Sequence, residues 1–267
     1  MAFKKFEKNI QSQFGEDGVI NEIFKRIGLK SKVCVEFGAW DGIHLSNTWN
    51  LWANEQWDAI LIEGDSDKFT TLSKNVQHLS NVSALNAFVT SSGQNSLDEI
   101  LSRINPQLGI DLLSIDIDGD DYYVFEGLKK YRPRLIIVEY NPTIPAHLNI
   151  VQNKGEYFGC SALALYKLGN SKNYELIHMT DTNMFFIDSS EFNKLKIETQ
   201  QLDELFPKKH LTNVFTSYNG TPFISGKPVY MADIKSEKGK RVKLPFVQQN
   251  NPDVMAITIA KKEVKND

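Results

Sequence analysis

A glycine-containing turn after a buried strand is the first feature of this sequence that could do chemistry. The apolar run at 33–37 leads into the pattern Glu36-x-Gly38-x-x-x-Gly42. Glycines at the end of a strand let the backbone approach a ligand closely, and an acid at the end of the next strand can bind ribose hydroxyls. Glu63 ends the second apolar run of the chain. The pattern therefore predicts a site for a nucleoside cofactor.

The spacing within this turn favours S-adenosylmethionine (SAM) over a dinucleotide. Dinucleotide sites use Gly-x-Gly-x-x-Gly, whose third glycine lets a helix N-terminus meet the pyrophosphate. Here Glu36 would repel a pyrophosphate, whereas a carboxylate attracts the ammonium of SAM. An NAD-dependent enzyme is also disfavoured because no Tyr-x-x-x-Lys pair occurs; Gly127 stands four residues after Tyr123.

Oxygen-bearing side chains end two further predicted strands. Asp116 and Asp118 follow the fourth strand, and Glu139 and Asn141 close the fifth. Adjacent strands would place these oxygens across one crevice, where hard ligands of this kind bind Mg²⁺, Mn²⁺ or Ca²⁺. The alternative is that the same residues orient the substrate or the methionine part of the cofactor without a metal.

The elements that position these residues alternate along the chain. Strands are predicted near 33–37, 58–62, 82–89, 111–117 and 134–140, with helices near 46–55, 66–78, 95–104 and 120–129. This alternation, with strands apolar on both faces, predicts an α/β fold in which helices cover a parallel sheet. Two later strands, near 174–179 and 184–188, predict an antiparallel hairpin at the sheet edge.

The signals weaken after residue 189, where short elements are punctuated by proline and glycine. We therefore predict one domain over residues 1–190. Residues 191–267 are expected to form a C-terminal extension that packs on the same domain and shapes the substrate pocket.

The bulk composition narrows the functional classes. The chain has 267 residues, 30 Lys plus Arg, 33 Asp plus Glu and a formal net charge of -3, which gives no reason to expect nucleic-acid binding. No stretch approaches the roughly 20 apolar residues of a membrane span. Two cysteines and the absence of an apolar N-terminal run predict a reducing, cytoplasmic location. A homo-oligomer is left open.

Several motifs, taken in order, resemble those of the class I SAM-dependent methyltransferases, specifically the FkbM-like group. They are Ser12-Gln13-Phe14-Gly15-Glu16-Asp17-Gly18, Val35-Glu36-Phe37-Gly38-Ala39-Trp40-Asp41-Gly42, Ser46-Asn47-Thr48, Ile62-Glu63-Gly64-Asp65, Leu113-Ser114-Ile115-Asp116-Ile117-Asp118-Gly119, Val138-Glu139-Tyr140-Asn141 and Tyr157-Phe158-Gly159-Cys160-Ser161. The resemblance covers about residues 10–190. It implies a seven-stranded Rossmann-like sheet with SAM as the cofactor. It also implies O-methylation of a small-molecule acceptor, a sugar or phosphorylated intermediate of surface polysaccharide or natural-product biosynthesis.

The resemblance also implies which residues contact the cofactor. Glu36 and Gly38 would meet the methionine part, Glu63 the ribose, and Asp116 the floor of the crevice. The complete set of expected cofactor-binding residues is Gln13, Glu36, Gly38, Ala39, Asp41, Gly42, Asn47, Glu63, Gly64 and Asp116.

The expected mechanism is in-line transfer of the SAM methyl group to an oxygen nucleophile. A divalent cation held by Asp116 or Asp118 with Glu139 or Asn141 would lower the pKa of the acceptor hydroxyl. His147 or a carboxylate would accept the proton. The expected catalytic residues are therefore Asp116, Asp118 and His147.

Two other classes stay open at this point. The Asp116-x-Asp118 pair is also typical of metal-dependent nucleotide-sugar glycosyltransferases, although that function leaves the glycine turn without a role. A non-catalytic SAM-binding module would keep the cofactor pocket without turnover, and the acidic crevice argues against it.

Overall fold

The computed structural model describes residues 2–105 and 107–211. Beyond them it describes the stretches 213–216, 218–219, 222–225, 234–235, 241–242, 246–248 and 255–257. Contacts within the chain divide it into two compact units, Met1–Phe206 and Pro207–Asp267. Among the described residues, no helix combines the length and the apolar character that crossing a bilayer requires.

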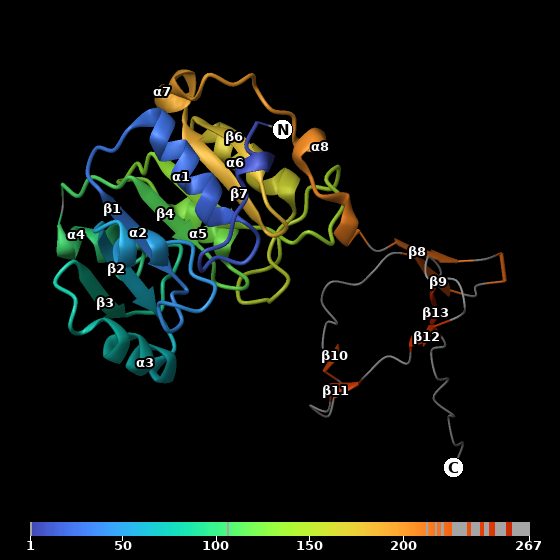
Figure 1. The fold of residues 1–267 in the computed structure, drawn as a ribbon. Helices are drawn as coiled ribbons and strands as arrows, with labels where there is room; N and C mark the ends of the chain where they lie inside the picture. Colours follow the sequence, from blue (N-terminus) through green and yellow to red (C-terminus); the bar gives the residue numbers. More distant parts are fainter. Residues whose placement is uncertain are drawn as a thin grey trace, which may run out of the picture. The chain divides into compact units, whose positions relative to one another are not determined.

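A seven-stranded sheet with the order β3-β2-β1-β4-β5-β7-β6 forms the centre of the first unit (Figure 1). Its strands are β1 (Val33–Phe37), β2 (Asp58–Glu63), β3 (Val82–Asn86), β4 (Leu112–Ile115), β5 (Leu135–Glu139), β6 (Tyr174–Met179) and β7 (Asn183–Asp188). Strands β1 to β5 are parallel, and β7 runs antiparallel to both β5 and β6. The predicted α/β class, the seven-stranded sheet and the antiparallel hairpin are confirmed.

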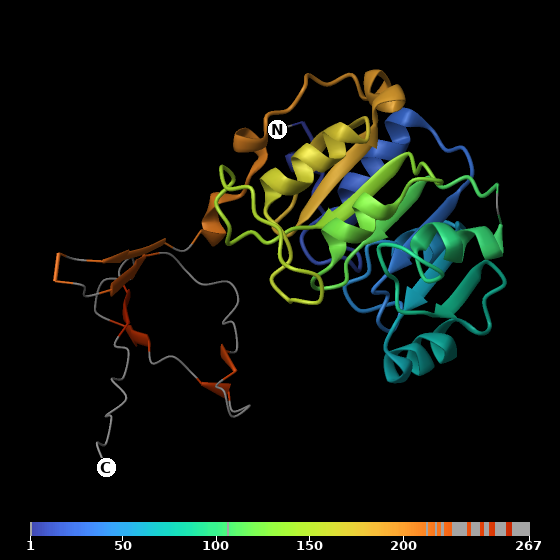
Figure 2. The same cartoon turned by 180° about the vertical axis from the view of Figure 1, so that it is seen from behind.

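Helices cover both faces of this sheet. They are α1 (Glu16–Ile27), α2 (Trp49–Asn54), α3 (Ser66–Val76), α4 (Leu97–Ile104), α5 (Asp121–Gly127) and α6 (Ala162–Ser171), preceded by the 3₁₀ turn η1 (Lys4–Phe6). Buried residues of α1, α2 and α3 share one hydrophobic core with one face of the sheet. Helices α1 and α2 lie in front of the sheet in Figure 1, and α4, α5 and α6 lie in front of it in the reverse view of Figure 2.

Strand order and register bring the candidate residues to one edge of the sheet. β1 lies between β2 and β4, with Glu36 in register with Leu61 and Ser114. Because β1 to β5 are parallel, their carboxyl ends share one edge, where ligands bind in open α/β sheets. Glu63 and Glu139 are the last residues of β2 and β5.

Short polar residues start the helices that follow these strands. The Asp65 carboxylate accepts hydrogen bonds from the backbone N–H groups of Asp67 and Lys68 at the start of α3. Ser96 and Ser161 cap α4 and α6 in the same way through their hydroxyl oxygens. Such caps satisfy N–H groups that have no partner within the helix.

The first unit extends past the boundary at 190 that the sequence suggested. It includes α7 (Ser189–Phe192), the 3₁₀ turn η2 (Asn193–Leu195) and α8 (Leu202–Leu205). Leu195, Leu202, Leu205 and Phe206 are buried. Their apolar side chains therefore attach this stretch to the first unit.

The second unit begins with the 3₁₀ turn η3 (Lys208–His210) and contains short antiparallel strands. These are β8 (Asn213–Thr216), β9 (Pro222–Ser225), β10 (Ile234–Lys235), β11 (Arg241–Val242), β12 (Phe246–Gln248) and β13 (Met255–Ile257). Four of them form a sheet in the order β12-β13-β9-β8, and β10 pairs with β11. The role that we predicted for the C-terminal extension in shaping the substrate pocket stays a prediction.

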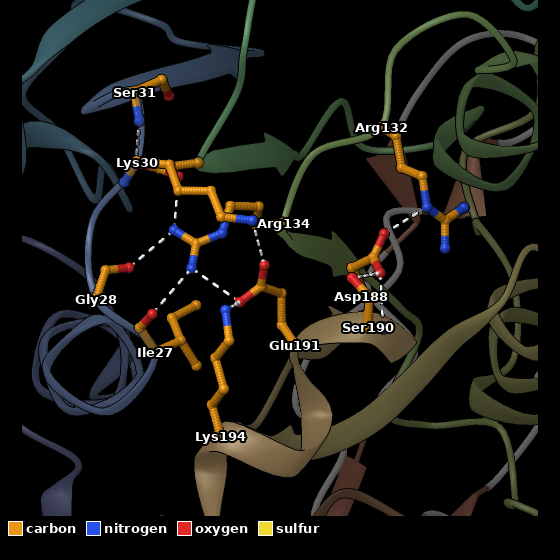
Figure 3. Close-up of polar contacts among 11 residues, drawn as sticks. Ile27, Gly28, Lys30, Ser31, Arg132, Arg134, Asp188, Ser190, Glu191 and Lys194 are labelled. Carbon is orange, nitrogen blue, oxygen red and sulfur yellow. Dashed lines mark hydrogen bonds and ion pairs between the residues drawn. The ribbon is translucent and has the colours of Figure 1, made fainter.

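A buried arginine, Arg134, joins several elements at the amino ends of the parallel strands. Figure 3 shows its guanidinium between Ile27, Gly28 and Glu191. Arg134 Nη1 lies 2.8 Å from Asp111 Oδ1 and 2.8 Å from the Gly28 carbonyl oxygen. Its Nη2 donates to Glu191 Oε2 at 3.0 Å and to the Ile27 carbonyl oxygen at 3.1 Å. One side chain thereby connects α1, β4, β5 and α7.

Both acids around this arginine have further partners. Asp111 Oδ2 accepts three consecutive backbone N–H groups, beginning with that of Lys30. Lys30 and Lys194 also bind the Glu191 carboxylate, at 2.5 Å and 2.6 Å. Burial raises the pKa of Glu191, but the hydrogen bonds from Arg134, Lys194 and Lys30 outweigh it and lower the pKa to about 2. This network stabilises the unit away from the chemistry.

Candidate active site

The glycine turn after β1 touches the end of β4. Gly38 has φ of 75°, and a Cβ atom at this position would lie 1.6 Å from the carbonyl oxygen of Asp116. Only glycine fits such a close approach in a left-handed conformation. Gly42, with φ of 81°, closes the turn by donating to the Ala39 carbonyl oxygen at 2.7 Å.

Asp41 and Trp40 shape the outer part of the same turn. Asp41 Oδ1 accepts the backbone N–H groups of Ile43 and His44 at 2.9 Å and 2.7 Å. Trp40 is 47% exposed and packs edge-on against His44. The Lys68 ammonium lies 4.0 Å from the centroid of the Trp40 ring. Trp40 therefore lies on the outer surface of the turn.

Glu36 is buried and its carboxylate is used within the protein. It accepts from Ser46 Oγ at 2.5 Å, from the Asn47 backbone N–H at 2.9 Å and from Thr48 Oγ1 at 2.7 Å. Burial raises the pKa of Glu36, and these three hydrogen bonds oppose the rise. Glu36 thus holds residues 46–48 against β1. The Asn47 side-chain amide in turn donates to Ser114 Oγ on β4 at 3.1 Å.

Glu63 joins the ends of β1 and β2. Its Oε2 accepts the Trp40 backbone N–H at 2.8 Å, and its Oε1 accepts the Asp65 backbone N–H at 2.8 Å. Each carboxylate oxygen has a second lone pair, so both oxygens can still accept a hydrogen bond from a ligand hydroxyl. The next residue, Gly64, packs against Phe88, whose ring is 73% exposed.

Three of the predicted carboxylates come together at the ends of β4 and β5. Carboxylate oxygens of Asp116, Asp118 and Glu139 lie within 4.8 Å of one another. Burial and the charges of Asp121 and Asp118 raise the pKa of Asp116 well above its usual value. Burial and the charge of Asp116 do the same to the pKa of Glu139. Like charges this close favour binding of a proton or a cation.

The turn that carries this cluster is held by Asp121. Its Oδ1 and Oδ2 accept the backbone N–H groups of Ile117 and Gly119, both at 2.9 Å. Burial raises the pKa of Asp121 to about 6, although these hydrogen bonds act in the opposite direction. Asp121 starts α5, which lies within the helical segment predicted near 120–129. Asp118, between the two N–H donors, adopts φ of 55°.

Comparison with known proteins identifies the domain. Residues 52–159 match the family model described as "Methyltransferase FkbM domain". The chain contains an FkbM-type methyltransferase domain. The resemblance that the motifs indicated is thereby confirmed. The matched range includes Glu63, Asp116, Asp118 and Glu139, and the glycine turn lies before its start. No protein of curated function matches the sequence.

Solved structures similar to the methyltransferase domain share little sequence with it. A SAM-dependent methyltransferase from Aquifex aeolicus is 13% identical, with 69% of this chain and 94% of that chain covered and a TM-score of 0.38. M. capricolum TrmK in complex with S-adenosyl-homocysteine (SAH) is 16% identical, with coverages of 73% and 76% and a TM-score of 0.42. The N-terminal domain of EvdMO1 with SAH bound is 10% identical, with coverages of 64% and 79% and a TM-score of 0.41.

Other predicted residues of the methyltransferase domain are placed less directly. His147 is exposed in the connection after β5. The Asn141 amide oxygen already accepts from the Thr143 N–H and Oγ1, at 2.9 Å and 2.6 Å. Gln13 is exposed, but Ser12 next to it forms a bridge with Leu45, so this segment lies beside the turn after β1. Their roles stay predictions.

Two features near the site escaped the sequence reasoning. Phe88 was treated as part of a strand, yet β3 ends before it and its ring is exposed. Gln152 is 1% exposed and makes four side-chain hydrogen bonds. Phe88 could have been recognised as an aromatic residue just past the end of an apolar strand. Gln152 could not, because a single glutamine in a long connection carries no local pattern that reveals its partners.

Proposed function

We propose that this domain transfers the methyl group of SAM to an oxygen of a small-molecule acceptor. The match to the FkbM methyltransferase domain carries the proposal, and it favours methyl transfer over glycosyl transfer. In line with the resemblance, we propose as acceptor a sugar or phosphorylated intermediate of surface polysaccharide or natural-product biosynthesis. A cytoplasmic location stays a prediction.

The residues at the carboxyl edge fit SAM. Glu63 has two free lone pairs for the ribose hydroxyls, and Gly38 and Gly42 keep side chains away from the turn that would face the ligand. Ala39, Asp41 and Gly64 lie on the turns after β1 and β2, Asn47 lies in the segment that Glu36 holds, and Gln13 lies on the segment beside the turn after β1. We propose that these residues complete the contacts. Glu36 acts on the methionine part through residues 46–48, whose Ser46, Asn47 and Thr48 groups its carboxylate holds in place.

The proposed chemistry is a displacement at carbon. SAM supplies a methyl group activated by its positively charged sulfur. The acceptor oxygen forms the new bond to the methyl carbon as the carbon–sulfur bond breaks and SAH leaves. The hydroxyl proton passes to a carboxylate of the Asp116, Asp118 and Glu139 cluster or to His147. A carboxylate whose pKa is raised is suited to take up a proton near neutral pH.

SAH binding tests the cofactor assignment. Wild-type protein is expected to bind SAH in a calorimetric titration, and Glu63→Ala to weaken binding by about 10- to 100-fold, the loss expected when charge-assisted hydrogen bonds are removed. Glu99→Ala, at an exposed position on α4, is the matched control and should bind as the wild type does. Wild-type protein that fails to bind SAH would contradict the methyltransferase proposal, and a nucleotide sugar with Mn²⁺ would then be titrated instead.

We also propose that the Asp116, Asp118 and Glu139 cluster binds a divalent cation that activates the acceptor hydroxyl. With the cation bound, the proton passes to His147, because a cation lowers the pKa of the carboxylates that hold it. At pH 8, Mg²⁺ or Mn²⁺ a hundredfold above its Kd should stabilise the protein by about 2.7 kcal/mol. Thermal unfolding with and without EDTA measures this. Asp118→Asn should lose the response and Glu99→Gln should keep it. An unchanged Tm in millimolar cation would leave the cluster as a proton acceptor only.

A further inference from the structure

The connection between β5 and α6 is organised by one buried amide. Gln152 Oε1 accepts the backbone N–H groups of Phe158 and Gly159 at 2.9 Å and 2.6 Å. Its Nε2 donates to the Glu156 carbonyl oxygen at 2.6 Å and to Asp120 Oδ1 at 2.9 Å. Both donor hydrogens and both acceptor positions are used, so the side chain has one satisfied orientation.

The same segment, which we name the 152–160 loop, is closed by contacts of its own and tied by Asn141 to the chain just after β5. Gln152 N–H donates to the Gly159 carbonyl oxygen at 3.0 Å, and Val151 pairs with Cys160. The Asn141 side-chain amide donates to the Phe158 carbonyl oxygen at 2.9 Å. The loop is thus closed at its base and tied to the residues that follow β5.

A second set of contacts places the loop against the turn after β4. Asp120 Oδ1 accepts the Gly155 backbone N–H at 3.0 Å in addition to the Gln152 amide. A Cβ atom on Gly119 would lie 2.7 Å from the Glu156 carbonyl oxygen, so the loop packs directly on Gly119. Gly119 follows Asp118 of the carboxylate cluster. The loop therefore lies next to the proposed site of proton transfer.

This firmly held loop presents two aromatic side chains to solvent. Tyr157 is 89% exposed and Phe158 is 43% exposed. Among the described residues of the first unit, the only other exposed aromatic side chains are Trp40 and Phe88. All four follow strands of the parallel set, at the edge where ligands bind in such sheets. Tyr157 packs against little of its own protein, so packing does not account for its position.

We propose that the 152–160 loop binds the methyl acceptor, with Gln152 as its positioning residue and the Tyr157 and Phe158 rings in contact with a ring-shaped acceptor. The inference rests on the proposed function and deepens it. An aromatic face gains favourable contact when the apolar face of another ring covers it. Because Gln152 already fixes the backbone, little conformational freedom is lost on binding.

A phenyl hexoside, which contains a sugar ring and an aromatic ring, is the probe that tests the loop. It is titrated into the protein with and without saturating SAH, and binding is measured by calorimetry. Tyr157→Ala is expected to weaken probe binding about fivefold, whereas Tyr157→Phe restores it because the ring face is kept. Gln152→Ala should weaken probe binding at least as much. SAH affinity should change less than twofold in all three variants.

Leu29→Ala is the matched control, because Leu29 is an exposed apolar residue that precedes β1 at the opposite edge of the sheet. It should leave probe binding unchanged. Equal probe binding by wild type, Tyr157→Ala and Gln152→Ala would overturn the proposal, as would no probe binding to the SAH-saturated wild type. If Gln152→Ala does not fold, the comparison of Tyr157→Ala with Tyr157→Phe tests the proposal. SAH binding is measured before the probe is added, so a failure of the proposed methyltransferase function is detected separately. If SAH does not bind but probe binding still depends on Tyr157, the loop is kept as a ligand site and the methyltransferase function is rejected.

Discussion

Gly38→Ala is expected to lower the free energy of unfolding by about 3 kcal/mol and to abolish measurable SAH binding. The new Cβ would lie 1.6 Å from the Asp116 carbonyl oxygen, and the residue would keep a φ of 75°. The backbone must then move, which separates the turn after β1 from the end of β4. Urea unfolding and calorimetric SAH titration measure the two effects.

Gly93→Ala is the control that separates the two effects expected in Gly38→Ala, the steric clash of the new Cβ and the strain of a positive φ. Gly93 has φ of 80°, but no atom lies within 4 Å of a Cβ placed there. This variant should lose only about 1–2 kcal/mol, the cost of a left-handed conformation for an alanine. SAH binding should be preserved. If both variants lost the same stability and both bound SAH, the close approach of β1 and β4 would not be needed for the site.

Arg134→Met is expected to lower the free energy of unfolding by about 3–5 kcal/mol. Methionine fills a similar volume but removes the guanidinium that pairs with the buried Asp111 carboxylate. Glu191 also loses this partner but keeps the ammonium groups of Lys30 and Lys194. Asp111 and Arg134 directly precede β4 and β5, and Glu191 follows the antiparallel β7, so the affected residues lie at the amino ends of the parallel strands, away from the carboxyl edge. Urea denaturation at pH 7 measures the loss, and SAH affinity should change less than twofold as long as the protein is folded.

Lys194→Met is the matched control for this network. Lys194 also binds Glu191, but its side chain is 47% exposed, and exposed ion pairs contribute less than about 1 kcal/mol. A small loss in Lys194→Met with a large loss in Arg134→Met would locate the stabilisation at the buried guanidinium. Losses of similar size in the two variants would contradict that view.

Local patterns were sufficient to predict the elements and the edge of the sheet that carries the site. Strands such as β4, buried along its whole length, appear in the sequence as short apolar runs separated by helical segments. Helical segments such as the one predicted near 66–78 are observed between the strands, here as α3. Both signals depend on neighbours within a few residues, which is why they could be interpreted before any contact was known.

The approach of distant segments was decided only by the tertiary structure. Gly38 was expected to approach a ligand, and it also approaches the Asp116 carbonyl because β4 lies beside β1. Glu36 was expected to contact the ammonium of the cofactor. In the structure its carboxylate oxygens instead accept hydrogen bonds from Ser46, Asn47 and Thr48.

The same distinction explains the residues that the sequence did not reveal. The Gln152 amide and the Arg134 guanidinium bind groups brought together by the fold, including a partner of Arg134 that lies 57 residues away along the chain. The sequence by itself therefore determined the strands, the helices and the acidic edge, because those depend on short-range periodicity. Only the tertiary structure decided which buried donor meets which acceptor, because burial demands a partner without specifying where in the chain it lies.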